Sequence, residues 1–258
     1  IPCGDLNEAV EFFTTRLGFR VDMIFPADEP SVALISGHGV GIRLERPAVA
    51  LAAAGDIRTQ QRPEARRDAA AQPIISRSEE AKWISGRAGM EYRDLIPGRL
   101  DGRLIASLIR LPGGAVADYV HYHKVRFQMI YCWHGRVRVV YEGQGEPFWL
   151  HPGDCVLQPP EIRHRVLEAS EGAQVIELTS PGSHETWADH DMTLPTAGQM
   201  PERDFGGQVF VRRKVSDSTI MPGESGGFES HHFGIATATG GTVRVIELRS
   251  PDDHSAYA

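Results

Sequence analysis

The sequence predicts a mostly β protein of the α+β class, in which strand-rich units follow a single N-terminal helix. The 27 glycines and 17 prolines among 258 residues indicate many turns and therefore short strands rather than long helices. One well-formed helix pattern lies near the start, and short strand-like runs separated by Gly-rich or Pro-rich turns follow it. A hydrophobic fraction of 41% and a charged fraction of 24% are typical of an ordinary globular protein.

The helix pattern occupies residues 5–18. Asp5 is expected to be the N-cap because Glu8 follows three residues later and an apolar stripe begins beside it, while Gly18 ends the stripe. Three short strands are predicted next, at 19–25, 31–36 and 40–45, with turns between them. The order of this first unit is therefore helix, strand, strand, strand.

This first unit resembles one module of the glyoxalase, or vicinal oxygen chelate, superfamily. The resemblance is carried by D-L-x-x-A-V-x-F-F-x-x-x-L-G-F from Asp5 to Phe19 and by a strand that ends in Gly-Ile-Arg-Leu-Glu. Members of that family build a ligand site from two βαβββ modules, and Glu45 stands where they carry a ligand. Most of the first strand is missing before Ile1 and no second module follows. We therefore expect a partial module at 1–45 that serves packing or dimerisation, with Glu45 solvated.

An Ala-, Arg- and Pro-rich stretch at 46–78 is expected to be a linker. Beyond it the strand-like runs lie at short and fairly even spacing, which is typical of a β-sandwich or a small barrel. They are predicted at 104–111, 119–123, 127–133, 136–142, 147–150, 154–158, 164–168 and 174–179.

Two histidines in one of these predicted strands, His121 and His123, carry the clearest chemical signal. Side chains alternate between the faces of a strand, so both imidazoles point the same way and form a metal-chelating pair. Gln128 follows after four residues, and a second cluster runs from Gly153 to His164.

The two clusters resemble the two motifs of the cupin superfamily. They read G-x6-H-x-H-x4-Q-x6-G from Gly114 and G-x5-P-x4-H from Gly153. The resemblance implies a cupin β-barrel, or jelly roll, at 79–195, with His121, His123 and His164 as metal ligands. Gln128 replaces the family's glutamate and is expected to act in catalysis, as a weak ligand or beside the ligands. Glu161 replaces a glycine that is usual in the second motif.

Three neutral imidazoles would leave the full +2 charge of a divalent metal and open coordination positions, which suits an anionic bidentate substrate. We expect one divalent ion, with Fe(II) favoured and Mn, Ni or Zn as alternatives. The expected function is that of a mononuclear metal-dependent dioxygenase, an oxidoreductase, acting on a small chelating or aromatic acid. A metal-dependent isomerase or lyase is one alternative, and a non-catalytic cupin that binds or senses a small molecule is another.

Three further side chains are candidates for binding the small-molecule substrate. Alternation places Arg126 and Cys132 on the face of Gln128, while Gln158 approaches from another strand. If they do not bind substrate, the Arg126 side chain is expected to reach solvent and Cys132 is expected to be a core residue. A second cluster, His184, Asp189 and His190, falls in a polar loop, matches no metal spacing and is not expected to form a site.

Residues 196–258 resemble the first strands of a second cupin, as in bicupin proteins, and we expect that second barrel to be truncated. A formal charge of -7 provides no basic surface for nucleic acid, and no apolar run approaches the ~20 residues that span a membrane. Three widely spaced cysteines form no disulfide framework, and the start lacks a signal peptide. We expect a cytoplasmic homodimer that pairs through outer barrel strands.

Overall fold

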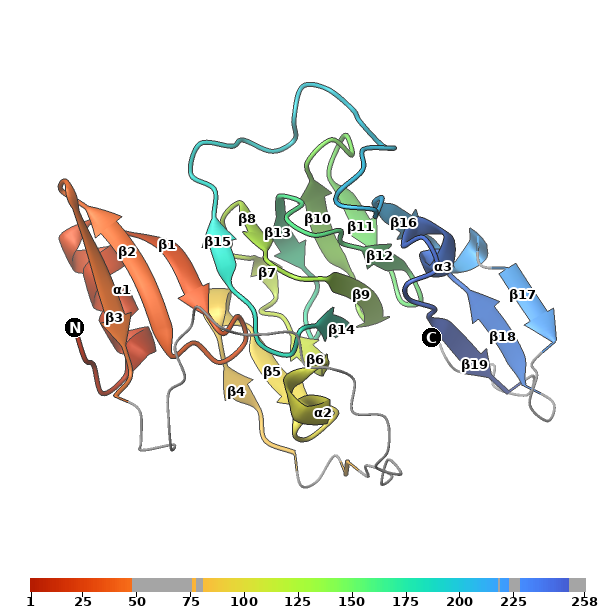
Figure 1. The fold of residues 1–258 in the computed structure, drawn as a ribbon, viewed down its shortest axis with the longest axis horizontal. Coiled ribbons are helices and arrows are strands. Elements are labelled where there is room, and N and C mark those ends of the chain that lie inside the picture. The colour runs from red at the N-terminus through yellow and green to blue at the C-terminus, as the bar shows by residue number, and fades with distance from the viewer. Residues whose placement is uncertain (48–75, 78–80, 218, 223–227, 251–258) are drawn as a thin grey trace.

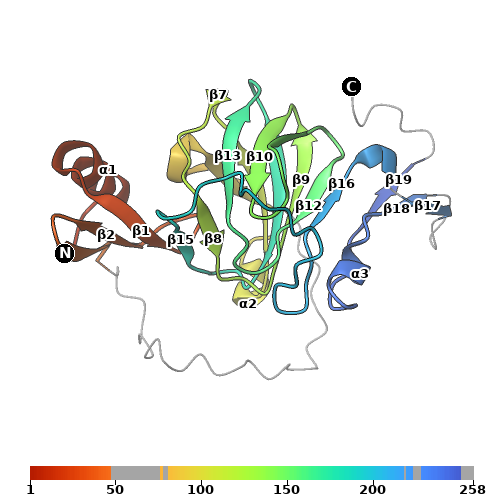
Figure 2. The same cartoon turned by 90° about the horizontal axis from the view of Figure 1, so that it is seen from above.

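The computed structural model describes residues 1–47, 76–77, 81–217, 219–222 and 228–250. Two curled β-sheets form the centre of the molecule, with an N-terminal unit at one side and a small C-terminal sheet at the other (Figures 1 and 2). Nearly all of the expected linker at 46–78 lies outside the described residues. No helix among the described residues is long and apolar enough to cross a membrane.

The first sheet has nine strands and runs from the barrel into the N-terminal unit. In spatial order they are β11 (Phe148–Leu150), β10 (Val137–Tyr141), β13 (His164–Ala169), β8 (His121–His123), β15 (Thr186–Ala188), β1 (Arg20–Phe25), β2 (Val32–Gly37) and β3 (Val40–Glu45), with β7 (Gly114–Ala115) pairing β13.

The second sheet has seven strands and faces the first across the barrel. Its order is β16 (Val211–Arg213), β12 (Cys155–Leu157), β9 (Phe127–His134), β14 (Gln174–Ser180), β6 (Ile105–Arg110), β5 (Glu91–Asp94) and β4 (Ile84–Ser85). The eight strands predicted between residues 104 and 179 are confirmed, with ends that differ by a few residues.

The core of the barrel lies between these sheets and is built from strand residues that alternate inward. Val137 and Val139 of β10, together with Leu150 of β11, pack against Val156 and Val175 of the opposite sheet. Each of the five side chains is at most 5% exposed. At roughly 25 cal/mol per Å² of buried apolar surface, this layer is a main source of the barrel's stability.

Helix α1 (Leu6–Leu17) begins and ends where the sequence predicts. The Asp5 side chain accepts a hydrogen bond from the Glu8 backbone N–H at 3.0 Å, and Gly18 takes the left-handed conformation that closes the helix. The helix packs on β1, β2 and β3 through a cluster that includes Leu6 and Ile35. The predicted order of one helix and three strands is confirmed.

The N-terminal unit shares its sheet with the barrel instead of standing apart from it. Strand β1 pairs antiparallel with β15, with Met23 opposite Trp187 and Ile24 opposite Thr186. Strand β15 in turn pairs with β8, which carries two of the candidate metal ligands. The first 45 residues are therefore joined by hydrogen bonds to the sheet that holds the site.

The C-terminal residues form a three-stranded sheet of β17 (Thr219–Pro222), β18 (Glu229–His232) and β19 (Ile246–Arg249) with helix α3 (Ile235–Ala238). Phe233 and Ile235 pack against Phe127 and Leu157, on the outer face of the second barrel sheet. The resemblance of 196–258 to a second cupin stays a prediction. The remaining short helices are the 3-10 turns Arg87–Gly89 and Val215–Asp217 and helix α2 (Arg99–Gly102).

Candidate metal centre

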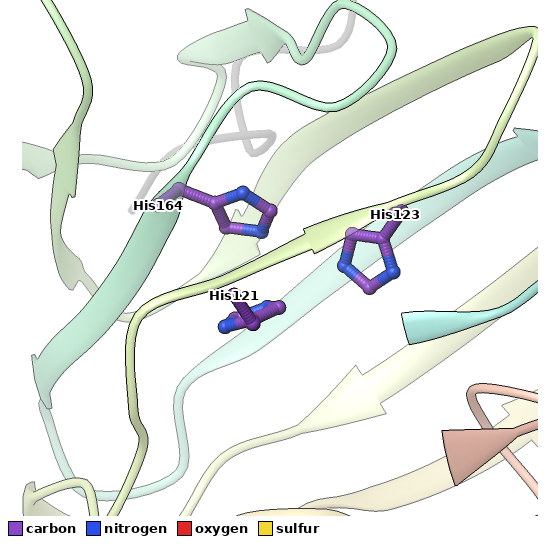
Figure 3. A group of neighbouring side chains, drawn as sticks. All are labelled: His121, His123 and His164. Atoms are coloured by element: carbon purple, nitrogen blue, oxygen red, sulfur yellow. The ribbon is translucent and has the colours of Figure 1, made fainter. Parts of the chain in front are cut away.

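The three histidines of the two sequence motifs meet inside the barrel. His121 and His123 lie on β8 and His164 begins β13, where His164 is the direct antiparallel partner of His121. One nitrogen from each ring lies within 4.8 Å of the others, and ring centroids are 4.2 Å apart for His121 and His164. Figure 3 shows the rings of His121 and His123 on one strand beside the ring of His164 on the neighbouring strand. The structure thus brings together the three residues predicted as metal ligands.

The outward nitrogen of each ring already has a partner. Nδ1 of His121 lies 2.8 Å from the Tyr119 carbonyl oxygen, and Nδ1 of His164 lies 3.0 Å from the Ile162 carbonyl oxygen. Because a carbonyl only accepts, both Nδ1 atoms carry the proton and both Nε2 atoms keep a lone pair. Nδ1 of His123 lies 2.8 Å from the Thr186 hydroxyl, which fits the same tautomer. Such outer partners are typical of metal-binding histidines.

Burial keeps all three imidazoles neutral. Loss of solvation lowers the pKa of His164 to about 4, and it lowers the pKa of His121 and His123 well below 6.5. The positive charge of Arg87 adds to the lowering at His121. A neutral imidazole is the form that binds a metal, so no proton has to leave these rings at pH 7.

Arg87 is the main complication for a metal at this position. Its Nη2 donates a hydrogen bond to Nε2 of His121 at 2.7 Å, and its Nη1 forms an ion pair with Asp118. The Asp118 carboxylate also accepts from the backbone N–H groups of Tyr119 and Val166. Burial alone would raise the pKa of Asp118, but the charge of Arg87, with His121 and the Val166 N–H, holds it at about 2. The histidines therefore fit a divalent ion, provided that Arg87 releases Nε2 of His121.

A cavity opens beside the triad and is lined by His123 and His164. Its volume is about 70 Å³, measured as the space open to the centres of water-sized molecules. Most of its wall is apolar, and polar side chains gather at a few places, which is the usual design of a small-molecule site. The polar and charged lining residues other than the histidines of the triad are Asp28, Arg87, Gln128, Gln158, Glu177 and His184.

Gln128 lies in this cavity, but its amide nitrogen is used by a carboxylate on the next strand. It donates to Oε1 of Glu177 at 2.6 Å, and the Thr179 hydroxyl donates to the same oxygen at 2.9 Å. Strand β14 pairs with β9 so that Thr179 lies opposite Gln128, which places Glu177 on the same inward face. The cavity thus contains a carboxylate, although not at the motif position. Glu177 could not be predicted from the sequence, because no pattern within β9 or β14 indicates that these two strands pair.

The predicted substrate-binding residues separate into two groups. Gln158 lines the cavity, where its side chain hydrogen-bonds the Tyr141 hydroxyl. Arg126 and Cys132 do not line it: Cys132 lies on the same inward face of β9 as Gln128 but packs in the barrel core, and Arg126 precedes the strand. Strand β9 begins at Phe127, so the alternation does not extend back to Arg126, whose side chain is exposed. Cys132 is fully buried in the core, and burial raises the pKa of its thiol to about 12.

His184 lines the cavity, although its sequence cluster is not expected to form a site. It is 3% exposed, and its ring centroid is 5.2 Å from that of His123. It precedes Thr186 by two residues, and Thr186 lies opposite His123 in the pairing of β15 with β8. Only that long-range pairing identifies His184 as a neighbour of the triad. Asp189 and His190, its companions in the sequence cluster, pair instead with Arg163 and Asp22.

One family model and a number of solved structures are similar to parts of this chain. Residues 107–179 match the family model described as Cupin domain. Among solved structures, a deletion mutant of Bacillus subtilis oxalate decarboxylase is 14% identical, with a TM-score of 0.45; the match covers 69% of this chain and 57% of that one.

Two smaller structures match over a shorter part of the chain. An RmlC-like cupin from Shewanella frigidimarina is 25% identical, with 43% of this chain and 92% of that one covered and a TM-score of 0.36. KdgF from Halomonas sp. is 24% identical, with coverages of 42% and 93% and a TM-score of 0.34. No curated protein matches the chain. The segment that the Cupin domain model matches, residues 107–179, contains His121, His123 and His164, and it forms a cupin domain.

Proposed function

We propose that the cupin domain binds one divalent metal ion through His121, His123 and His164, and that the protein is a mononuclear metal-dependent enzyme. The observation that carries this proposal is the orientation of the three buried rings. Their Nδ1 atoms are held by Tyr119, Thr186 and Ile162, so the Nε2 atoms of His123 and His164 are left for a common ligand, and that of His121 joins them once Arg87 releases it. A scaffold without a metal would gain nothing from burying three imidazoles within 4.8 Å of one another.

The reaction class that we favour is oxidation of a small chelating or aromatic acid by a dioxygenase, with Fe(II) as the metal. The bound ion would supply Lewis-acid activation and redox chemistry. The chain itself provides three neutral ligands, which leave the charge of the ion available to an anionic substrate. Apolar side chains such as Ile109, Leu111 and Val175 line the cavity and suit an aromatic ring.

An isomerase or lyase is the second candidate, and one observation favours it. Glu177 and His184 line the same cavity as the triad and are both buried. A carboxylate and an imidazole close to a chelated substrate could move a proton without any change in the oxidation state of the metal. The chain therefore contains groups for proton transfer as well as groups for metal binding.

Elemental analysis of protein purified without chelators or a metal-affinity column tests the proposal, together with oxygen uptake on catecholic and hydroxybenzoate acids. Near-stoichiometric iron with oxygen uptake is the expected result. Zinc, nickel or manganese without oxygen uptake would favour the isomerase or lyase. Absence of any metal from the wild-type protein would instead support a role in binding or sensing a small molecule.

Substitution of the ligands provides the matched test. His121→Ala and His164→Ala are each expected to abolish metal binding, because two imidazoles cannot hold the ion as three do. His134→Ala removes an exposed histidine at the end of β9 and is the control, with unchanged metal content. Full metal occupancy in either ligand variant would contradict the assignment of the site.

We also propose that residues 1–45, the part that resembles a glyoxalase module, serve packing. The pairing of β1 with β15 supports this role. The Glu45 side chain is 43% exposed and paired with Arg43, which supports a solvated carboxylate at that position.

A further inference from the structure

His184 is a buried imidazole with few hydrogen-bond partners. Its side chain is 3% exposed, and neither ring nitrogen makes a hydrogen bond of good geometry with the described residues, the Pro181 backbone being the one group that acts on the ring as a hydrogen-bond partner. A buried donor or acceptor without a partner costs about 1–3 kcal/mol. Natural proteins keep such groups at few places, and a polar side chain that faces a cavity is one of them. With one nitrogen turned to Pro181, the other is available to whatever occupies the cavity.

The position of His184 relates it to the metal centre. Its ring centroid is 5.2 Å from the ring centroid of His123, and both residues line the same cavity. A molecule that chelates an ion on the triad with one end would extend across the His184 ring with the other. His184 is thus placed to contact a part of the ligand that the metal does not hold.

The charges around His184 indicate which group it would contact. Glu177 and Asp28 line the same cavity, and both act on His184 as negative charges. The Glu177 carboxylate has amide and hydroxyl partners but no ion pair among the described side chains, whereas Asp28 is paired with Arg99. A second carboxylate on the ligand would be repelled here. An uncharged hydroxyl can donate to the unprotonated imidazole nitrogen without bringing a further charge into the cavity.

We propose that His184 is the specificity-determining residue of the cavity and that it recognises an uncharged hydroxyl group on a metal-chelating ligand. The proposal rests on the proposed function, because the chelating end of the ligand is held by the metal of the triad. It narrows the substrate class from chelating or aromatic acids to hydroxylated ones. Glu177 acts beside it by disfavouring a second anionic group.

The test uses calorimetric titration of the whole protein loaded with zinc, which binds ligands without redox turnover. Salicylate is the reference probe, since it chelates through its carboxylate and its adjacent hydroxyl. The 2,3-, 2,4-, 2,5- and 2,6-dihydroxybenzoates add one hydroxyl at each remaining type of ring position. We expect at least one of them to bind on the order of 10- to 100-fold more tightly than salicylate. The analogue that has a carboxylate in place of that hydroxyl should bind no more tightly than salicylate.

Variants of His184 test whether this residue causes the tighter binding of the probe with the extra hydroxyl. His184→Leu should abolish the advantage of the extra hydroxyl while salicylate still binds, and His184→Gln, which keeps a donor and an acceptor, should retain part of it. His134→Leu is the control at an exposed histidine and should behave as the wild type. Because His184→Leu removes polar atoms with few partners from the interior, its melting temperature should be unchanged or higher. If His184 served only the fold, the substitution would lower the melting temperature.

Two results would overturn the assignment. One is that no dihydroxybenzoate binds more tightly than salicylate, and the other is that the preference survives in His184→Leu. Zinc content of the same samples tests the proposed function separately. If zinc does not bind, the same probes are titrated into the metal-free protein, and absence of a hydroxyl preference there overturns the assignment as well.

Discussion

Arg87 and His121 make the single contact that most affects how the centre would take up a metal. The guanidinium donates to the Nε2 atom that a metal would need, and Asp118 holds the other side of the guanidinium. A cation at this distance also raises the free energy of a divalent ion bound to the same ring. Arg87 therefore competes with the metal in two ways, by occupying a lone pair and by adding positive charge.

Replacing Arg87 should show how much this residue weakens metal binding and how much it stabilises the fold. Arg87→Met is expected to tighten zinc binding by about tenfold, equal to about 1.4 kcal/mol, because the lone pair of His121 becomes available and a like charge is lost. It should also lower the free energy of unfolding of the metal-free protein by about 3–5 kcal/mol, since Asp118 loses its partner in a buried ion pair. Competition titration against a zinc-binding dye measures the first effect and urea unfolding measures the second.

Arg110→Met is the matched control for Arg87→Met. Arg110 forms an ion pair with Glu91 on the surface, where both side chains are about 40% exposed. Both its zinc affinity and its stability should stay near the wild-type values. Unchanged zinc affinity in Arg87→Met would mean that the guanidinium does not obstruct the metal.

Single residues also show the limit of what the sequence can predict about the site. His121, His123 and His164 were predicted because strand alternation and motif spacing are local properties. Arg87, Glu177 and His184 were not predicted, because each reaches the cavity through pairing between distant strands or through a loop. Arg126 lies one residue before β9 begins, so strand alternation alone does not locate its side chain.

At the scale of elements, the turn between β12 and β13 positions the third histidine. Glu161 lies in this turn with a φ of 62°, in the left-handed region that side chains with a Cβ rarely adopt. Its backbone N–H donates to the His123 carbonyl at 3.2 Å, so the turn is held against the strand of the first two ligands. Glycine is usual at this motif position in the family that the sequence resembles, and the backbone explains that preference.

Glu161→Gly is expected to stabilise the protein. Relief of the left-handed strain is worth about 1–2 kcal/mol, and part of it is lost to the greater freedom of glycine in the unfolded chain. A net gain of about 0.5–1 kcal/mol should raise the melting temperature by roughly 1–4 °C. Glu171→Gly replaces another exposed glutamate and should give no such gain. A lower melting temperature in Glu161→Gly would indicate that the side chain itself stabilises the turn.

The whole molecule should become less stable on mild acidification because its interior contains neutral histidines. The pKa of His164 is about 4 in the folded protein, and those of His121 and His123 are also lowered, against about 6.5 in the unfolded chain. The unfolded chain therefore binds more protons in this range, and stability present above pH 6.5 is lost as the pH falls toward 4. Asp118 has a pKa of about 2 in the folded protein and about 4 in the unfolded chain. The stability that it contributes is therefore lost only as the pH falls from about 4 toward 2.

Urea unfolding of the metal-free protein between pH 7.5 and pH 4 measures this effect. A pKa lowered from 6.5 to about 4 corresponds to a loss on the order of 3 kcal/mol for His164 alone. His164→Leu should give a shallower dependence on pH than the wild type. Equal slopes for the two proteins would contradict the assignment of the effect to this histidine.

The overall arrangement was predictable only in part. The helix, the three strands after it and the eight barrel strands follow from local patterns and are confirmed. The order of the strands in each sheet is not a local property. In particular, the continuation of the barrel sheet through β15 into β1 joins segments about 160 residues apart, and no pattern within either segment indicates it.

That shared sheet changes what the N-terminal segment does for the protein. Without residues 1–45, β15 would become an edge strand with a row of unpaired backbone N–H and C=O groups next to the ligand strand β8. Exposed edges of this kind recruit strands from other molecules and lead to aggregation or strand exchange. Residues 1–45 therefore cover this edge of the barrel sheet, and a protein shortened by them is expected to self-associate.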